Sequence, residues 1–115
     1  MIILCFVMVF SSLEVESIPI NFLDPRPGTP LAAASRLRPA DCLRVLAMFR
    51  FVNPTRDIRV AGGREVNLRH LQPLALYPAN SMFSQGYLTT PGQGHEADLR
   101  MIEDLGFRLA EVVAE

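Results

Sequence analysis

Two short segments of the chain carry a large apolar side chain at every second position, residues 18–23 and 57–61. Successive side chains of a strand point to opposite faces, so this pattern predicts two strands with one buried face each. The side predicted to face helices carries Ile18, Ile20, Phe22, Ile58 and Val60. The opposite side carries Pro19, Asn21, Leu23, Arg59 and Ala61. A third, shorter strand is predicted over residues 81–84.

Helical periodicity appears between and after these strands. Residues 39–52 are predicted to form a helix that begins at Pro39, which suits a first turn, and ends before Asn53-Pro54. Apolar residues recur on one of its faces at intervals of three and four, namely Cys42, Val45, Leu46, Phe49 and Val52.

Two further helices are predicted closer to the C-terminus. One begins near Asn67 as its N-cap and is interrupted by Pro73, which removes a backbone hydrogen bond. The other covers residues 95–105 and ends at Gly106. The buried sides of these two helices are predicted to carry Leu68, Leu71 and Ala75, and then Leu99, Ile102 and Leu105.

The order strand, helix, strand, helix, strand, helix predicts an α/β fold with parallel strands and helices outside them. This βαβαβα order fits both a doubly wound open sheet and a (βα)₈ barrel. About three strands are too few for either architecture, because a complete barrel takes about 250 residues. We therefore expect an incomplete architecture, which leaves two sheet edges open.

Composition narrows the candidate partners. A net charge of −1 provides no field that would gather nucleic acid or an anionic membrane. The two cysteines, Cys5 and Cys42, form no C-x-x-C pair, and Cys42 on its apolar helix face is expected to be a small buried hydrophobic residue. His70 and His95 are distant in sequence, without an acidic cluster, and predict no metal site. These features favour a reducing, cytoplasmic location.

The N-terminus begins with an unbroken apolar run at residues 2–10. The run is much shorter than the roughly 20 residues that span a bilayer as a helix, and no basic residues precede it as they would in a signal peptide. It is either a buried strand or helix, a leader processed after Ser12, or a start that differs from the native gene, and we favour the last. The expected organisation is an apolar segment 1–15, a domain 16–107 and a tail 108–115.

Three motifs now carry a family resemblance. They are Ile-Pro-Ile-Asn-Phe-Leu at 18–23 with Pro-Gly-Thr-Pro-Leu at 27–31, Ile-Arg-Val-Ala-Gly-Gly-Arg-Glu at 58–65, and Ala-Asn-Ser-Met-Phe at 79–83 followed by the loop 86–92. In order and spacing they resemble the sixth, seventh and eighth strands of the biotin synthases, which are radical S-adenosylmethionine enzymes. The resemblance runs from about residue 16 to 107 and implies the C-terminal part of a (βα)₈ barrel.

The resemblance also implies roles for two residues. Asn21 matches an asparagine that contacts the ureido ring of dethiobiotin, and Arg59 matches an arginine that is a metal ligand of the 2Fe-2S cluster. Without the resemblance, Arg59 is interpreted as an ion-pair arginine and Asn21 as a strand-end cap. Arg64 and Glu65 are expected to brace the loop after the second strand, and no catalytic residue is predicted.

The parent reaction that the resemblance implies is radical-based sulfur insertion into dethiobiotin, which gives biotin. Its cofactors are a 4Fe-4S cluster, a 2Fe-2S cluster and S-adenosyl-L-methionine. Neither Cys5 nor Cys42 matches a cluster ligand of the family, and clusters are held by thiolates, so we expect this chain alone to hold none and to be inactive. The alternatives are a noncatalytic half-barrel that self-associates or complements an N-terminal partner, and a secreted or membrane-associated small protein.

Overall fold

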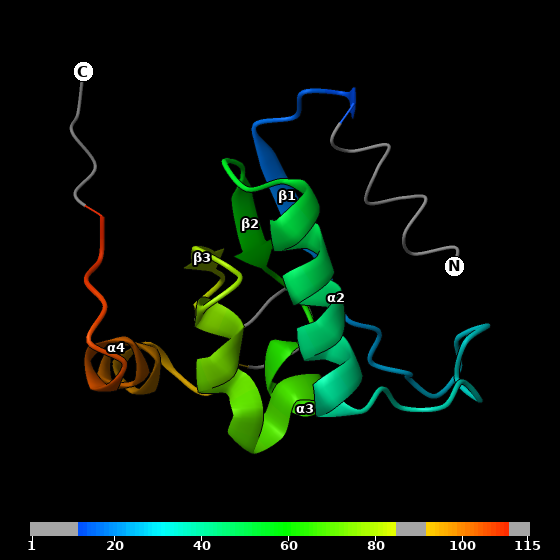
Figure 1. The fold of residues 1–115 in the computed structure, drawn as a ribbon. Helices are drawn as coiled ribbons and strands as arrows, with labels where there is room; N and C mark the ends of the chain where they lie inside the picture. The colour runs from blue at the N-terminus through cyan, green and yellow to red at the C-terminus, as the bar shows by residue number, and fades with distance from the viewer. Residues whose placement is uncertain (1–11, 85–91, 111–115) are drawn as a thin grey trace.

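Three short parallel strands form the centre of the molecule in a computed structural model, which describes residues 12–84 and 92–110. They are β1 (Ser17–Ile20), β2 (Asp57–Val60) and β3 (Ser81–Met82), hydrogen-bonded in the order β1-β2-β3 (Figure 1). The strands are connected through helical segments, so the predicted α/β class with parallel strands is confirmed. The two outer strands each leave one edge without a described neighbour.

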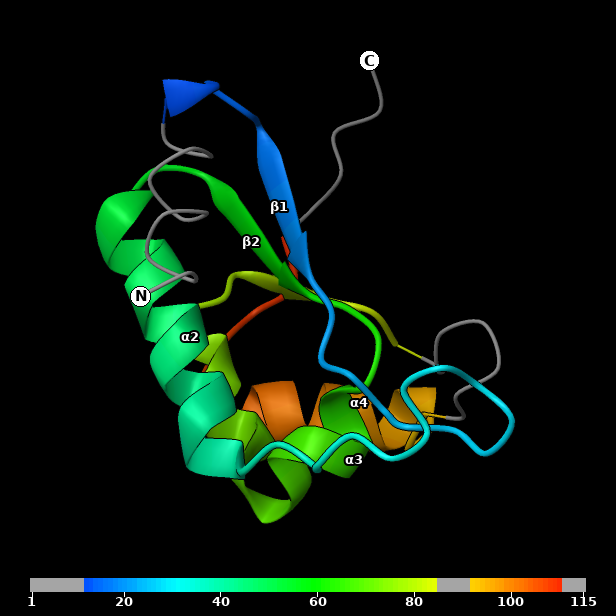
Figure 2. The same cartoon turned by 90° about the vertical axis from the view of Figure 1, so that its right-hand side faces the viewer.

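One face of this sheet is covered by α2 (Pro39–Val52), which has the predicted bounds and lies along β1 and β2 (Figures 1 and 2). The predicted apolar face of α2 packs there, with Cys42, Leu46 and Phe49 buried. The strands contribute the residues that alternation assigned to the helix side, Ile18, Ile20, Phe22, Ile58 and Val60. The buried core therefore lies between α2 and one face of the sheet.

The opposite face of the sheet, which we call the open face, carries no described helix (Figure 2). Strand pairing places Ser17 opposite Asp57, Pro19 opposite Arg59, and Arg59 opposite Ser81. Ser17 and Pro19 are exposed, and the other three are partly buried. The predicted alternation of the two faces is thus confirmed along β1 and β2.

The second helical segment differs from its prediction. It begins at Arg64 rather than near Asn67, as α3 (Arg64–Leu68), and continues as the 3₁₀ helix η1 (Arg69–Leu76). Asn67 is therefore not the N-cap. It is buried inside α3, where Nδ2 donates to the carbonyl oxygens of Gly63 at 2.8 Å and Leu23 at 3.1 Å.

The apolar residues of this segment are only partly placed as predicted. Leu68 and Ala75 are buried, but Leu71 is 38% exposed, so its predicted burial is wrong. A 3₁₀ helix has three residues per turn rather than 3.6, which moves Leu71 off the buried side. Pro73 lies inside η1, where the missing N–H fits the altered hydrogen bonding.

The last helix, α4 (His95–Asp104), lies beyond the β3 side of the sheet, away from α2 (Figure 1). It ends as predicted, with Gly106 at a φ of 75° and its amide donating to the Glu103 carbonyl oxygen at 2.8 Å. Leu99, Ile102 and Leu105 are only partly buried, and the fully buried residue of α4 is Asp98. The expectation that an apolar stripe forms the inward side of α4 is therefore only partly met.

Some sequence-based predictions fall outside the described residues. The apolar run 2–10 is one, and most of the loop 86–92 is another. Within residues 12–84 and 92–110, no helix combines the length and the apolar character needed to cross a bilayer.

Candidate functional site

A polar network crosses all three strands on the open face. Its centre is Asp57, whose Oδ2 accepts hydrogen bonds from Ser17 Oγ at 2.8 Å and from Arg59 Nη2 at 3.1 Å. Its Oδ1 accepts from Ser81 Oγ at 3.0 Å, and Arg59 Nε donates to the same Ser81 oxygen at 3.1 Å. Strand pairing explains the arrangement, because it brings Ser17 beside Asp57 and Ser81 beside Arg59.

Arg59 is the one cationic side chain of this network. The guanidinium carbon lies 5.8 Å from the ring centroid of Phe83, over the ring. The Nε and Nη2 atoms are hydrogen-bonded, whereas Nη1 makes no hydrogen bond with the described part of the chain. The side chain keeps 38% of its surface exposed, so one edge of the guanidinium remains open to a ligand.

Asn21 follows β1 directly and lies two positions beyond Pro19, the residue paired with Arg59. Its Oδ1 accepts a hydrogen bond from the backbone N–H of Gly62 at 2.8 Å. Its Nδ2 donates to no residue in ranges 12–84 and 92–110. The side chain therefore joins the carboxyl ends of β1 and β2 with its oxygen and leaves its two N–H donors available on an exposed residue.

The turn after β2 approaches the end of β1 very closely. Phe22 N donates to the Gly62 carbonyl oxygen at 2.9 Å, and Gly63 has a φ of 76°. A Cβ at Gly63 would lie 2.0 Å from the Phe22 carbonyl oxygen, so only glycine fits. The Gly-Gly sequence thus brings the two strand ends together, which places Asn21 at the carboxyl edge of the sheet.

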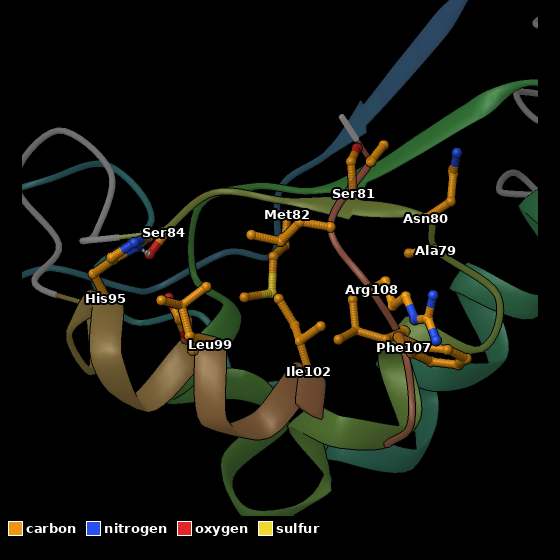
Figure 3. A pocket seen from close by; sticks show the side chains of 14 residues that line it. Ala79, Asn80, Ser81, Met82, Ser84, His95, Leu99, Ile102, Phe107 and Arg108 are labelled. Atoms are coloured by element: carbon orange, nitrogen blue, oxygen red, sulfur yellow. Dashed lines mark hydrogen bonds between the residues drawn. The ribbon is translucent and has the colours of Figure 1, made fainter. Parts of the chain in front are cut away.

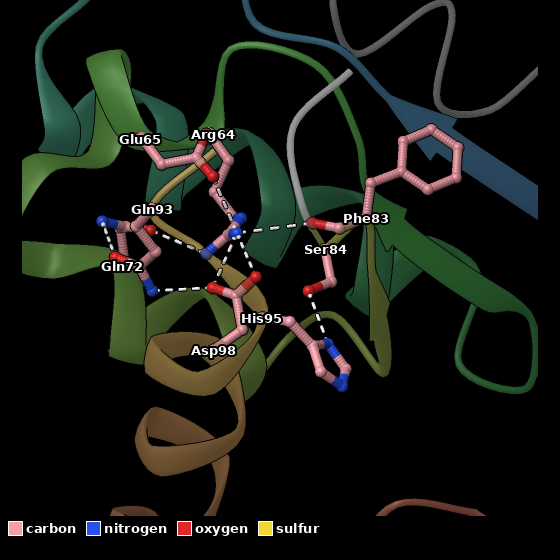
Figure 4. A network of polar contacts seen from close by, with 8 residues as sticks. All are labelled: Arg64, Glu65, Gln72, Phe83, Ser84, Gln93, His95 and Asp98. Atoms are coloured by element: carbon pink, nitrogen blue, oxygen red, sulfur yellow. Dashed lines mark hydrogen bonds and ion pairs between the residues drawn. The ribbon is translucent and has the colours of Figure 1, made fainter. Parts of the chain in front are cut away.

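A second network joins α3, η1 and α4 through Arg64, Gln72 and Asp98 (Figure 4). Arg64 Nη2 contacts both carboxylate oxygens of Asp98, at 2.8 and 3.0 Å, and each residue is only 1% exposed. Gln72 Oε1 accepts from Arg64 Nη1 at 2.7 Å, and Gln93 Nε2 donates to Asp98 Oδ1 at 2.7 Å. Because Arg64 also binds Glu65 at 2.8 Å, the predicted bracing role of this pair agrees with the geometry.

A pocket of about 510 Å³ lies between β3, α4 and residues 107–110 (Figure 3). Most of the side chains that line it are apolar, including Met82, Leu99 and Ile102. At one end of it Ser84 Oγ lies 3.1 Å from His95 Nδ1. The pocket follows the edge of β3 that pairs with no described strand.

An iron–sulfur cluster requires cysteine thiolates that hold its iron atoms. Cys42 is the described cysteine, and it lies in the core on the helix-covered side of the sheet, away from Arg59. Burial raises the pKa of the Cys42 thiol and so disfavours the thiolate. Over residues 12–84 and 92–110, no three His, Cys, Asp or Glu side chains are grouped as metal ligands would be. Arg59 can supply one contact, but the described residues alone do not fit a cluster.

Three residues that organise these networks, Ser17, Asp57 and Asp98, were not predicted from the sequence. Asp57 and Arg59 are two positions apart on a strand, a spacing that puts both on one face and could have identified the pair. Ser17 precedes the predicted strand, so the alternating pattern of residues 18–23 does not include it. No sequence pattern identifies Asp98, because its partner Arg64 is 34 residues away and only the fold brings the two together.

Most of this chain is similar in sequence to known proteins. The model of the Biotin and Thiamin Synthesis associated domain matches residues 19–108. Biotin synthase of Geobacillus kaustophilus (strain HTA426) is 60% identical over 98 residues, which cover 85% of this chain and 29% of that protein. Biotin synthase of Salinibacter ruber (strain DSM 13855 / M31) is 62% identical over 93 residues, covering 81% and 26%.

The identity to these relatives is confined to their C-terminal portion, as the motifs predicted. The chain spans less than a third of the length of the relatives described above. By the match over residues 19–108 and the identity of about 60%, the chain belongs to the Biotin and Thiamin Synthesis associated domain family and is homologous to the C-terminal region of biotin synthases.

Proposed function

We propose that this chain provides the C-terminal strands and helices of a biotin synthase barrel. The whole enzyme would insert sulfur into dethiobiotin by radical chemistry, in the cytoplasm, with S-adenosyl-L-methionine and with 4Fe-4S and 2Fe-2S clusters. By the resemblance, Asn21 and Arg59 both match site residues of the family. The observation that carries the proposal is that Asn21 directly follows β1 and accepts a hydrogen bond from Gly62 after β2, while Arg59 lies on the side of the sheet without a described helix. A barrel lumen is such a side, lined by strand residues and filled by side chains or ligands.

The polarity of the open face supports this assignment. Ionic and hydroxyl side chains occupy it at Ser17, Asp57, Arg59 and Ser81, while the helix-covered face is apolar. Polar side chains inside a protein require partners, and this network already satisfies part of that requirement. The Nη1 edge of Arg59 is then the group that would meet a cluster held by thiolates from the rest of the barrel.

Asn21 is proposed to contact dethiobiotin. Its fixed oxygen, held by the Gly62 N–H, orients the amide, and its N–H donors suit the ureido carbonyl oxygen of that substrate. The position also suits the role, because barrel enzymes bind ligands at the carboxyl ends of their strands. The cluster thiolates and the S-adenosyl-L-methionine site would come from the other part of the barrel, so this chain alone would be inactive.

Complementation tests the proposed function. The chain is co-expressed with the remaining, N-terminal portion of Geobacillus kaustophilus biotin synthase in a bacterium that cannot make biotin, and growth without biotin is scored. We expect growth with both parts and none with either part alone. Arg59→Ala and Asn21→Ala should abolish growth, whereas the exposed control Arg44→Ala should not. Growth that is unaffected by Arg59→Ala and Asn21→Ala would contradict the site assignment.

A noncatalytic half-barrel that pairs with a copy of itself is the second candidate. The unpaired edges of β1 and β3 and the apolar pocket along β3 favour it, since open edges and apolar grooves promote association. A stable homo-oligomer that does not complement the N-terminal portion would support this candidate over the first.

A further inference from the structure

We infer that Asp57 is the positioning residue of the open face, the side chain that fixes the guanidinium of Arg59 in the orientation used by the site. The inference rests on the proposed function for what Arg59 contacts, but the placement of Arg59 by Asp57 stands on the geometry alone. Asp57 itself touches no substrate or cofactor in this proposal, so it is not a catalytic residue.

The contacts of Asp57 reach across the whole sheet. From its position on β2 it accepts from Ser17 at β1, from Arg59 on its own strand, and from Ser81 on β3. Ser81 in turn accepts from Arg59 Nε, so the arginine is held twice, once directly and once through the serine. Two held nitrogens define the plane of the guanidinium, and the third nitrogen, Nη1, is then directed by that plane.

A long, partly exposed arginine side chain would otherwise populate several rotamers. The stacking of Arg59 on Phe83 restricts the guanidinium in one direction, and the Asp57 carboxylate restricts it in another. Aspartate is a poor strand former, and here it begins β2 with its carboxylate directed to the open face. Its position is therefore better explained by these contacts than by the propensity of the strand.

Arginine-specific modification with phenylglyoxal, followed site by site with mass spectrometry, tests this role on the full chain. A guanidinium held against a carboxylate reacts slowly, because the reagent requires a free, deprotonated group. In Asp57→Asn we expect Arg59 to react about tenfold faster, since a charge-assisted hydrogen bond is lost. Asp57→Glu should restore most of the protection, because it restores the charge.

Two internal references separate positioning from a loss of structure. Arg64 is buried against Asp98 and should stay unreactive in Asp57→Asn. The matched control Asp41→Asn removes a carboxylate that binds Arg38 and Arg44, so it should accelerate those two sites and leave Arg59 unchanged.

An unchanged Arg59 rate in Asp57→Asn would overturn the inference. A rise at Arg59 and Arg64 together would also overturn it, because Asp57 would then act on the fold as a whole. If Arg59 responds as expected while the complementation assay gives no biotin, the role of Asp57 stands and the proposed function fails.

Discussion

The two faces of the three-stranded sheet are built from the same strands but follow different physical rules. The helix-covered face is a closed apolar layer in which Ile58, Val60 and Leu46 have no exposed surface. The open face carries an ionic network whose central arginine keeps 38% of its side chain exposed. Alternation along β1 and β2 puts one set of side chains in the core and the other set where a larger structure or a ligand can meet it.

This difference separates what stabilises the chain from what it offers to a partner. The stabilisation from apolar burial is roughly proportional to the buried area. On the side of α2, the apolar residues of β1 and β2 are already buried. Partly exposed ion pairs contribute little to stability, so the open-face network is poorly explained as a stabilising device. We interpret it as a surface that binds a partner or a ligand. Substitutions on the helix-covered face should therefore mainly reduce stability, and substitutions on the open face should mainly reduce function.

The largest effect is expected where the carboxyl end of the sheet meets α4. Asp98→Asn removes the buried carboxylate of the pair and leaves Arg64 with Glu65 as its remaining carboxylate contact. We expect the free energy of unfolding to fall by about 3–4 kcal/mol, because breaking a buried ion pair is strongly destabilising. Chemical denaturation measures this loss. Asp104→Asn, on the exposed side of the same helix, is the control and should shift the midpoint little. Similar midpoints for the two variants would show that the buried pair does not hold α4.

On the helix-covered face, Leu46→Ala should destabilise the chain by about 3 kcal/mol, because it removes buried methyl groups and leaves a cavity. The matched control is Phe51→Ala on the same helix, since Phe51 is 86% exposed. Phe51→Ala should change the free energy of unfolding by less than about 0.5 kcal/mol. A larger loss for Phe51→Ala than for Leu46→Ala would mean that the described helix face is not the packed one.

On the open face, Arg59→Ala should cost less than about 1 kcal/mol of stability, as partly exposed ion pairs do. The same variant should abolish growth in the complementation assay. The combination of an intact denaturation midpoint and a lost function is what distinguishes the two faces. A stability loss as large as that of Leu46→Ala would place Arg59 among the structural residues.

The smallest effect concerns Cys42. Burial raises the pKa of its thiol, so above the ordinary thiol pKa of about 8.5 the unfolded chain releases a proton that the folded chain retains. Stability should therefore fall slightly between pH 7 and pH 9.5, and less so in Cys42→Ala. In a Cys5→Ser background, a thiol reagent should label Cys42 slowly until denaturant is added. Rapid labelling of the folded chain would contradict its burial.

The parts of the fold that depend on local periodicity were predictable. Helix 39–52 has the predicted bounds, and the two faces of β1 and β2 follow from alternation. The start of α3 was not predictable, because the left-handed Gly63 and its contact with Phe22 determine it, and that contact exists only in the folded chain. Leu71 was misplaced because the 3₁₀ segment changes the helical period.

The candidate site divides in the same way. Arg59 and Asn21 were found from motifs that resemble a family, and their functional roles stay predictions. The partners that hold them, Asp57, Ser81 and Gly62, come from strand pairing, since pairs 22, 24 and 41 residues apart become neighbours. Sequence periodicity defines a face, but only the register defines which residues on that face touch.

The central claim is that the open face and the free strand edges are completed by the rest of a biotin synthase barrel. Analytical ultracentrifugation and thermal melting of the chain, alone and co-expressed with the N-terminal portion of Geobacillus kaustophilus biotin synthase, test it most directly. Alone, the chain should self-associate through its open edges, and the two parts together should form a one-to-one complex. The account would be contradicted by a monomer that melts cooperatively at about 45–65 °C, the range of ordinary domains, and does not bind the N-terminal portion.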